Sequence, residues 1–503
     1  MLWLVLALGP ALGAADAQLI RGPYLQIGAS ISMVVRWRTD TPTDSRVRCG
    51  ATPTNLSLSF SDAALTTEHQ VRLEPLRPET VYYYAVGTTT ADLAGDADTF
   101  FITAPLPGQS RPTRIWFVSD FGFGDEGEIA VRDSYLRFAA ATRPADVWLS
   151  GGDNDQILGA DAHLQLALFD IYAPLLRTIP LWPTLGNHDA YTVSVPGPYP
   201  YFDNFTLPTQ GQAGGVASGS EHYYSFDYGD IHFVSLDSII PALSASPDTP
   251  MFRWLREDLS RNAQPWTIAF FHAPPYTKGN HDSDNPNDIE GRMIQMRENA
   301  LPILESHGVD LVLCGHSHVY ERSCLLHGHY GYSDSFSDVY TLDVGDGREE
   351  GDGAYRQANG KGTVYVVAGV GGMPIGFLHG AHPAHVVNIG TEAGSCVVDV
   401  NYGRLDFQFL SANSQVLDHF TLRKQIPLRL VWFRFTTNLV SLAWNSLPSQ
   451  RYQVEAAREL PGSWTPASAP ITAESTLISW SSSLPGGATN LFYRVTQLPE
   501  QSR

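Results

Sequence analysis

Five short segments carry the side chains of this chain that could do chemistry. They are Ser119-Asp120-Phe121-Gly122, Gly152-Asp153-Asn154, Gly186-Asn187-His188-Asp189, Phe270-Phe271-His272-Ala273 and Gly315-His316-Ser317-His318. Carboxylates, imidazoles and amide oxygens are the groups that bind divalent metal ions in proteins. Two metal ions about 3.5–4 Å apart can clamp a phosphate ester and generate a nucleophile near neutral pH. The five segments together predict a two-metal hydrolase.

An apolar run precedes each of these segments, at residues 114–118, 147–149, 180–182, 267–271 and 309–314. The runs are rich in β-branched or aromatic residues and are too short for buried helices, so they predict core strands of an α/β sheet. Ligands of such sheets gather beyond the carboxyl ends of the strands. We therefore expect the polar residues of all five segments to meet at one edge.

The residue types suggest how a metal pair would be held. Asp153 is the candidate bridge, because one carboxylate offers two oxygens. His316 and His318 leave a strand end with one residue between them and could serve different ions. The alternative for a single histidine is a satisfied core or surface residue, and for an aspartate at a strand end it is a helix N-cap.

In this order along the chain, the segments resemble those of the calcineurin-like metallophosphoesterases, and within them the purple acid phosphatase branch. The resemblance covers about residues 20–425 and includes Val319-Tyr320-Glu321-Arg322 directly after the histidine pair. It implies a four-layer α/β/β/α domain that holds two metal ions and shares Asp153 between them. The other ligands that it implies are Asp120 and His318 for the first ion, and Asn187, His272 and His316 for the second.

Two further histidines would act on the substrate in a protein of this kind. His188 would lie near the ester as proton donor to the leaving oxygen or as a hydrogen-bond partner in the transition state. His281, within the loop 278–284, would reach the substrate from the far side. The alternative for His281 is a solvated loop histidine among aspartates.

The sequence departs from the purple branch at the first metal. That branch has a tyrosine, an iron ligand, three residues after the bridging aspartate, where this chain has Gln156; related non-purple enzymes place a histidine at the position of Gly122. We therefore expect a first site with one protein ligand fewer, completed by water or by the Gln156 oxygen. Such a site favours divalent ions (zinc, manganese or iron) over ferric iron.

Composition shifts along the 503 residues predict three folded units behind an apolar leader. Residues 1–17 resemble a signal peptide, with Ala15-Asp16-Ala17 as a cleavage-like triplet. Alternating polar and apolar residues predict a fibronectin III-like N-terminal β-sandwich at 18–105 and a second β-sandwich at 428–503. The phosphoesterase domain is expected at 106–427, with a helix at 288–307 ended by Gly308 and kinked or restarted at Pro302.

The charge and apolar content limit the partners. A formal net charge of -20 argues against sustained binding to nucleic acid, whose phosphates require a basic surface. No later apolar run reaches the roughly 18 residues that a membrane span needs. Four cysteines are few for an exported chain, so buried free thiols are favoured over a Cys314–Cys324 bridge. These features predict a protein that is secreted or periplasmic; its oligomeric state is left open.

The sequence thus predicts a secreted binuclear phosphoesterase that hydrolyses small phosphomonoesters by attack of metal-bound hydroxide. One alternative is a phosphodiesterase or nucleotidase with the same site. The feature that bears on this choice is the substrate wall, which loops 203–222 and 328–362 are expected to form. Another is a non-catalytic surface-binding protein with a decayed enzyme domain.

Overall fold

The computed structural model describes residues 17–190, 200–357, 360–446, 449–475, 477–484 and 491–499. The predicted leader lies outside these residues, except for its last position. Among the helices of the described residues, none has the length and apolar character needed to cross a membrane.

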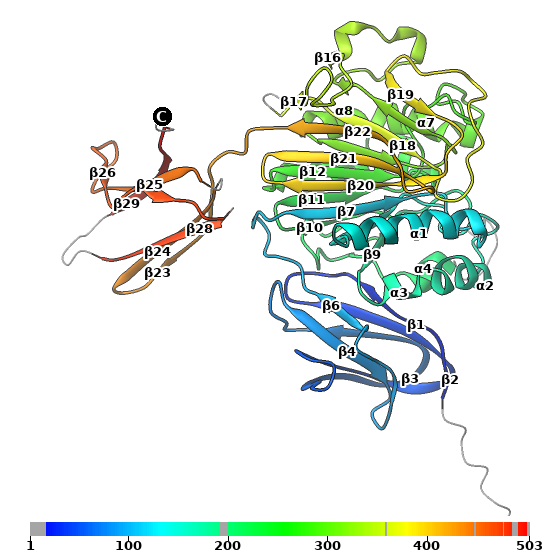
Figure 1. The fold of residues 1–503 in the computed structure, drawn as a ribbon, viewed down its shortest axis with the longest axis horizontal. Helices are drawn as coiled ribbons and strands as arrows, with labels where there is room; N and C mark the ends of the chain where they lie inside the picture. The colour runs from blue at the N-terminus through cyan, green and yellow to red at the C-terminus, as the bar shows by residue number, and fades with distance from the viewer. Residues whose placement is uncertain are drawn as a thin grey trace, which may run out of the picture.

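The N-terminal unit is built around one long strand. Residues 33–39 of β2 pair with β1 and with the end of β3, whereas residues 46–50 pair with β4 and residues 43–49 with the start of β3. Its core includes Trp37, Val47 and Tyr84. The strands are β1 (Leu19–Gln26), β2 (Met33–Gly50), β3 (Leu58–Leu73), β4 (Val81–Gly87), β5 (Asp92–Ala94) and β6 (Phe100–Ile102). This confirms the predicted N-terminal sandwich (Figure 1).

Two seven-stranded sheets form the central domain. In order across the first sheet, the strands are β10 (Tyr224–Tyr228), β11 (Ile231–Ser235), β12 (Trp266–Phe271), β13 (Leu311–Cys314), β18 (Val364–Ala368), β14 (Tyr320–Ser323) and β19 (His385–Ile389). Those of the second are β17 (Tyr355–Arg356), β22 (Val416–Arg423), β21 (Arg404–Ser411), β20 (Gly394–Asn401), β7 (Thr113–Val118), β8 (Val147–Ser150) and β9 (Leu181–Pro183). Strands β7, β8 and β9 run parallel, as do β11, β12, β13 and β18. Each of the five predicted core strands is present.

Helices cover the outer faces of both sheets. Trp116 of β7 stacks on Tyr135 of α1 (Glu126–Ala141) with ring centroids 4.0 Å apart. On the other side, α6 (Pro250–Arg261) and α8 (Leu301–Ser306) share a core with β13, whereas residues of both sheets form the core between them. The result is the expected four-layer α/β/β/α arrangement (Figure 1). Short helices and strands complete the domain: α2 (Asp161–Leu164), α3 (Ala173–Leu176), α4 (Pro200–Asn204), α5 (Pro241–Ser244), α7 (Arg292–Gln295), β15 (Leu325–Leu326) and β16 (Thr341–Asp343).

The prediction of a helix at 288–307 was wrong for its first residues. Ile289 and Glu290 have φ of 34° and 55°, so the continuous helical stretch begins at Arg292. The Asp288 carboxylate accepts hydrogen bonds from His281 Nδ1 and Asp282 N, which draws it away from the helix. A π-helical segment, Met296–Ala300, precedes Pro302, which lacks an N–H for the regular ladder. Gly308 ends the helix with φ of 72°, as predicted.

The C-terminal unit consists of two small sheets, β23-β24-β28 and β26-β25-β27 with β29 beside β25. Trp444, Tyr452 and Val454 lie in the core that they share. The strands are β23 (Leu430–Phe435), β24 (Leu439–Asn445), β25 (Arg451–Ala457), β26 (Thr465–Pro466), β27 (Ile471–Thr472), β28 (Leu477–Ser483) and β29 (Phe492–Gln497). The chain reaches this unit directly from β22 (Figure 1). All four cysteines are buried and free, so the Cys314–Cys324 bridge does not form.

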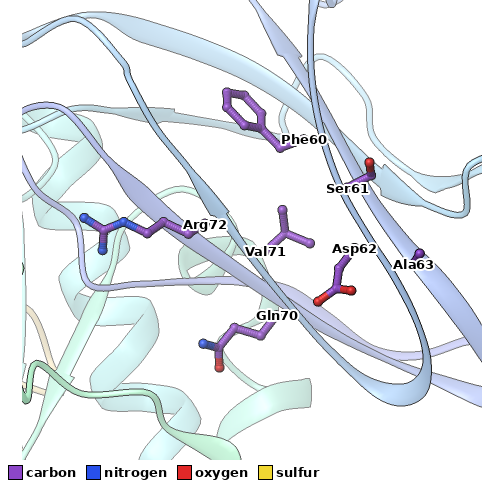
Figure 2. A pocket seen from close by; sticks show the side chains of 7 residues that line it. All are labelled: Phe60, Ser61, Asp62, Ala63, Gln70, Val71 and Arg72. Atoms are coloured by element: carbon purple, nitrogen blue, oxygen red, sulfur yellow. The ribbon is translucent and has the colours of Figure 1, made fainter.

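One surface hollow, of about 370 Å³, lies on the N-terminal sandwich against β3 (Figure 2). Phe60, Val71 and Arg72 contribute to its lining, together with one carboxylate, that of Asp62. It contains neither histidine nor cysteine, so it offers no metal-ligand set.

Candidate metal centre

The five predicted segments all begin at carboxyl ends of strands. Asp120, Asp153 and Asn187 come from the loops after β7, β8 and β9 of one sheet, and His272 and His316 follow β12 and β13 of the other. Contacts between these loops bring the two sheet edges together. The site therefore lies where parallel strands of both sheets end, as expected for ligand sites of α/β folds.

Three of the candidate ligands have left-handed backbone conformations, which set the directions of their side chains. Asp120, Asp153 and His316 have φ of 57°, 51° and 68°. These left-handed conformations are uncommon for residues with a Cβ, and such strain concentrates at functional sites. Neighbouring glycines make room: a Cβ on Gly186 would lie 2.0 Å from Asp153 Oδ1, and one on Gly315 would lie 2.3 Å from Asp120 Oδ2.

Four of the predicted ligands converge around the Asn187 side chain. Its Oδ1 lies 2.9 Å from His272 Nε2 and 2.9 Å from His316 Nδ1. His272 Nε2 is also 3.4 Å from Asp153 Oδ2. The other ring nitrogen of His272, Nδ1, lies 2.9 Å from the carbonyl oxygen of Gly151. Because a carbonyl oxygen can only accept, His272 Nδ1 donates this bond and carries the proton of the neutral ring. His272 Nε2 therefore presents a lone pair toward the oxygens of Asn187 and Asp153.

Lone pairs that face each other in a buried site need a cation between them. Without a metal, a proton takes this role: burial opposes the charge, but Asp153 and Asp120 outweigh it and raise the pKa of His272 to about 9. Burial likewise opposes ionisation of Asp153, yet His272 and His188 lower its pKa to about 2. A metal ion would replace that proton. The donor set therefore fits a divalent cation.

A second group lies beside the first. His318 Nε2 is 3.6 Å from Asp120 Oδ1, and His318 Nδ1 is 2.9 Å from the Met373 carbonyl oxygen, again leaving Nε2 toward a carboxylate. The backbone N–H of His316 donates to Asp120 Oδ2 at 2.9 Å. One ligand atom each of Asp120, Asp153 and His272 lies within 4.8 Å of the others. Asp153 thus stands between the two groups, where a bridging carboxylate would be.

Gly122 and Gln156, the two positions at which the sequence departs from related enzymes, differ in whether they can contribute a metal ligand. Gly122 has no room for a side chain, because a Cβ there would lie 2.2 Å from the Asn154 carbonyl oxygen. The buried Gln156 amide places Nε2 3.4 Å from Asp153 Oδ2. Since amide nitrogen and oxygen exchange by a simple flip, Gln156 can turn its oxygen toward Asp153, whereas Gly122 has no side chain to offer.

His188 lies at the open side of the centre. Its backbone N–H donates to Asp153 Oδ1 at 2.9 Å, and its Nε2 lies 4.0 Å from Asp153 Oδ2. Its side chain is 28% exposed, whereas that of His272 is fully buried. It can therefore meet a ligand that arrives from solvent.

One acidic residue of the site, Asp288, was not among the predicted site residues. The ring of His281 stacks on His316 with centroids 3.8 Å apart, and its Nδ1 bonds Asp288 Oδ1 at 2.8 Å. Asp288 Oδ1 is also 3.7 Å from His316 Nε2. Burial opposes the Asp288 charge, but the hydrogen bond from His281 and the nearby ring of His316 outweigh it and lower the pKa of this carboxyl. Burial also lowers the pKa of His316 to about 3, so this ring stays neutral and able to bind a metal.

Other polar residues near the site hold loops in place. Asp189 accepts N–H groups from Gly186, Asn154 and Asp155 at 2.9 to 3.2 Å and so joins the loops after β8 and β9. Farther away, Arg322 and Tyr320 bind the buried carboxylate of Asp418. They belong to the domain interior and do not face the centre.

Family models match two parts of the chain. Residues 113–320 match the model described as calcineurin-like phosphoesterase. This part of the chain is similar to the calcineurin-like phosphoesterases. Residues 20–104, before it, match the purple acid phosphatase N-terminal domain. Both assignments agree with the resemblance of the five segments and with the sheets described above.

Curated relatives of this chain include Purple acid phosphatase 23 of Arabidopsis thaliana, 28% identical over 56% of this chain and 62% of the relative. Purple acid phosphatase 18 of the same plant is 28% identical over 71% of this chain and 78% of its own length. The chain thus spans less than two thirds of the first relative. Among solved structures, purple acid phosphatase PPD1 from yellow lupin seeds shares the fold, with a TM-score of 0.62, 19% identity, and coverage of 81% of this chain and 74% of that one.

Proposed function

We propose that this chain is a secreted, binuclear metal-dependent phosphoesterase that hydrolyses phosphomonoesters. The observation that carries the proposal is the convergence of His272 Nε2 with side-chain oxygens of Asn187 and Asp153, an arrangement that suits a bound cation. The names of the curated relatives support phosphatase activity on such a centre.

The ligands divide into two sets that share Asp153. Asp120 and His318 would complete the first, and Asn187, His272 and His316 the second. When bound, the metal ions neutralise phosphate oxygens and supply a nucleophile near neutral pH. The chain itself fixes the ligand orientations, since the carbonyl groups of Gly151 and Met373 hold the rings of His272 and His318.

Two histidines are assigned to the substrate. His188 protonates the leaving oxygen or hydrogen-bonds to the phosphate, because its half-exposed ring lies next to Asp153 on the open side. His281 approaches from the other side, and Asp288 anchors its Nδ1, which leaves Nε2 for the substrate. A His281→Ala variant that keeps full activity would remove it from this assignment.

The first metal is proposed to be divalent. Gln156 replaces a tyrosinate by a neutral amide, and Gly122 adds no ligand, so the site has less negative charge to stabilise ferric iron. Secretion is proposed from the apolar leader at 1–17 and its cleavage-like triplet. Detection of mature protein starting near Gln18 outside the cytoplasm would support it.

The test uses the full chain, stripped of metal and reconstituted separately with zinc, manganese and iron. The kcat/KM for an aryl phosphomonoester is compared with that for the matching diester. A ratio well above one is expected with at least one metal. A ratio well below one would make the protein a phosphodiesterase. No turnover of either ester with metal bound would support the non-catalytic binding protein instead.

A further inference from the structure

Three chain segments without a charged side chain border the candidate ligands Asp120, Asp153 and His318. They are residues 121–124, 156–160 and 369–378, whose only hydrogen-bonding side chain is that of Gln156. They follow β7, β8 and β18, respectively. We refer to these three segments together as the apolar rim.

Backbone contacts join the first two segments to each other and to His188. The N–H of Gln156 donates to the Gly122 carbonyl oxygen at 2.8 Å. A Cβ on Gly159 would lie 3.0 Å from the His188 carbonyl oxygen, so residues 156–160 run directly beside the proposed proton donor. This part of the rim therefore lies on the open side of the centre.

The third segment is attached to the metal ligand His318. The ring Nδ1 of His318 is 2.9 Å from the Met373 carbonyl oxygen, and the Ile375 N–H donates to the His318 carbonyl oxygen at 3.0 Å. A Cβ on Gly372 would touch the ring of Phe123 at 2.4 Å, and that ring meets the His318 ring edge-on at 6.2 Å. Phe123 thus links the first segment to the third, and the rim is continuous around this side.

Large apolar side chains of the rim are open to solvent. Their exposed fractions are 50% for Ile157, 58% for Leu158, 48% for Met373, 48% for Ile375 and 67% for Leu378. Single exposed apolar residues are ordinary, but a cluster of them beside a polar site marks a surface that binds something apolar.

Positive charge is scarce around the centre. In the described loops that surround it (119–125, 151–160, 184–190, 272–288, 315–319 and 369–380), Lys278 is the only lysine or arginine. Its Nζ lies 2.5 Å from Asp282 and 3.0 Å from Asp284, so two carboxylates already neutralise it. A substrate with several phosphates needs cations beyond the metal pair, and these loops do not provide them.

We propose that the alcohol part of the substrate is a hydrocarbon group that packs on the apolar rim while its phosphate binds the metal pair. This inference rests on the proposed function and narrows it to soluble phosphomonoesters of apolar alcohols. Ile157, Leu158 and Ile375 then determine specificity, because they cover the hydrocarbon without touching the reacting atoms.

The test is a series of n-alkyl phosphates from ethyl to hexyl, which have nearly the same leaving-group pKa and differ in apolar area. On a half-open surface each methylene should raise kcat/KM about twofold, so hexyl phosphate, with four more methylenes, should exceed ethyl phosphate about 16-fold. In the double variant Leu158→Ser with Ile375→Ser, this ratio should fall to about one or two. Leu65→Ser, a leucine-to-serine change at a 74% exposed residue of the N-terminal sandwich, should keep the parent ratio.

The outcomes separate the inference from the function on which it rests. Hydrolysis of ethyl phosphate with no gain along the series would overturn the inference alone, as would an equal gain in the double variant. A gain that begins only where the ester forms micelles would assign the rim to a lipid surface and also overturn it. No hydrolysis of any ester would overturn the proposed function, and the inference with it.

Discussion

The buried ion network around His232 supports a quantitative prediction for stability. His232 Nδ1 lies 2.8 Å from Asp227, and its Nε2 lies 2.8 Å from Asp258, with only 2% of its side chain exposed. The same Asp258 carboxylate accepts the Ser225 hydroxyl and the Val216 N–H. The network thus joins β10, β11, α6 and the loop before β10, far from the metal ligands in sequence.

The magnitude follows from the pKa of this histidine. Burial opposes the charge, but the two carboxylates outweigh it and raise the pKa from 6.5 to about 9. A raised pKa means that the charged form stabilises the fold, in full below pH 6.5 and decreasingly as the pH rises through 9. One pKa unit corresponds to about 1.4 kcal/mol, so the contribution is about 3 kcal/mol.

The assay is urea unfolding of the parent and of His232→Gln from pH 6 to pH 10. The variant should be less stable by at least about 3 kcal/mol near pH 6.5, and the difference should shrink by about that amount above pH 9. Titrating groups that do not contact His232 behave alike in both proteins and cancel in the difference. His307→Gln, at the exposed end of α8, serves as the control. A difference that stays constant across this pH range would refute the reasoning.

Three further predictions concern the centre. Gly186→Ala should weaken metal binding at least tenfold, measured by chelator competition, because its Cβ would lie 2.0 Å from Asp153 Oδ1. The iron-loaded parent should show no tyrosinate charge-transfer band in its visible spectrum, whereas Gln156→Tyr should introduce one. Asp288→Asn should lower kcat/KM by about 10–100-fold by loosening His316, with a shifted pH–rate profile that a purely structural change would not produce.

Each of these three predictions has its own control or its own contradicting result. Gly219→Ala adds a Cβ in open space and should leave metal affinity unchanged. A visible band in the parent would contradict the assignment of a site without tyrosinate. Parent-like kinetics for Asp288→Asn would mean that its contact with His316 is incidental.

The ligand-bearing segments could be predicted because each follows an apolar run that forms a strand. Asp120 and Asp153 come after β7 and β8, and strand order alone brings their loops to one edge. The first residues of the predicted helix at 288–307 could not be predicted correctly, because the side chain of Asp288 is engaged by His281, a contact across a loop that no local periodicity reveals.

The backbone groups that orient the ligands could not be predicted from the sequence, for a different reason. The carbonyl groups of Gly151 and Met373 orient His272 and His318, but every residue has a carbonyl group, so sequence carries no mark of it. The role of Gly122 as a position with no room for a ligand also required coordinates, since it depends on the Asn154 carbonyl oxygen of another loop.

The most direct test of the central claim is the metal content of the parent and of Asp153→Asn, measured by mass spectrometry after reconstitution and dialysis. Two metal ions per chain are expected in the parent. In the variant at most one is expected, together with loss of phosphomonoester hydrolysis by at least about a thousandfold and an unchanged circular dichroism spectrum. Two ions per chain and equal hydrolysis in the variant would contradict the central claim.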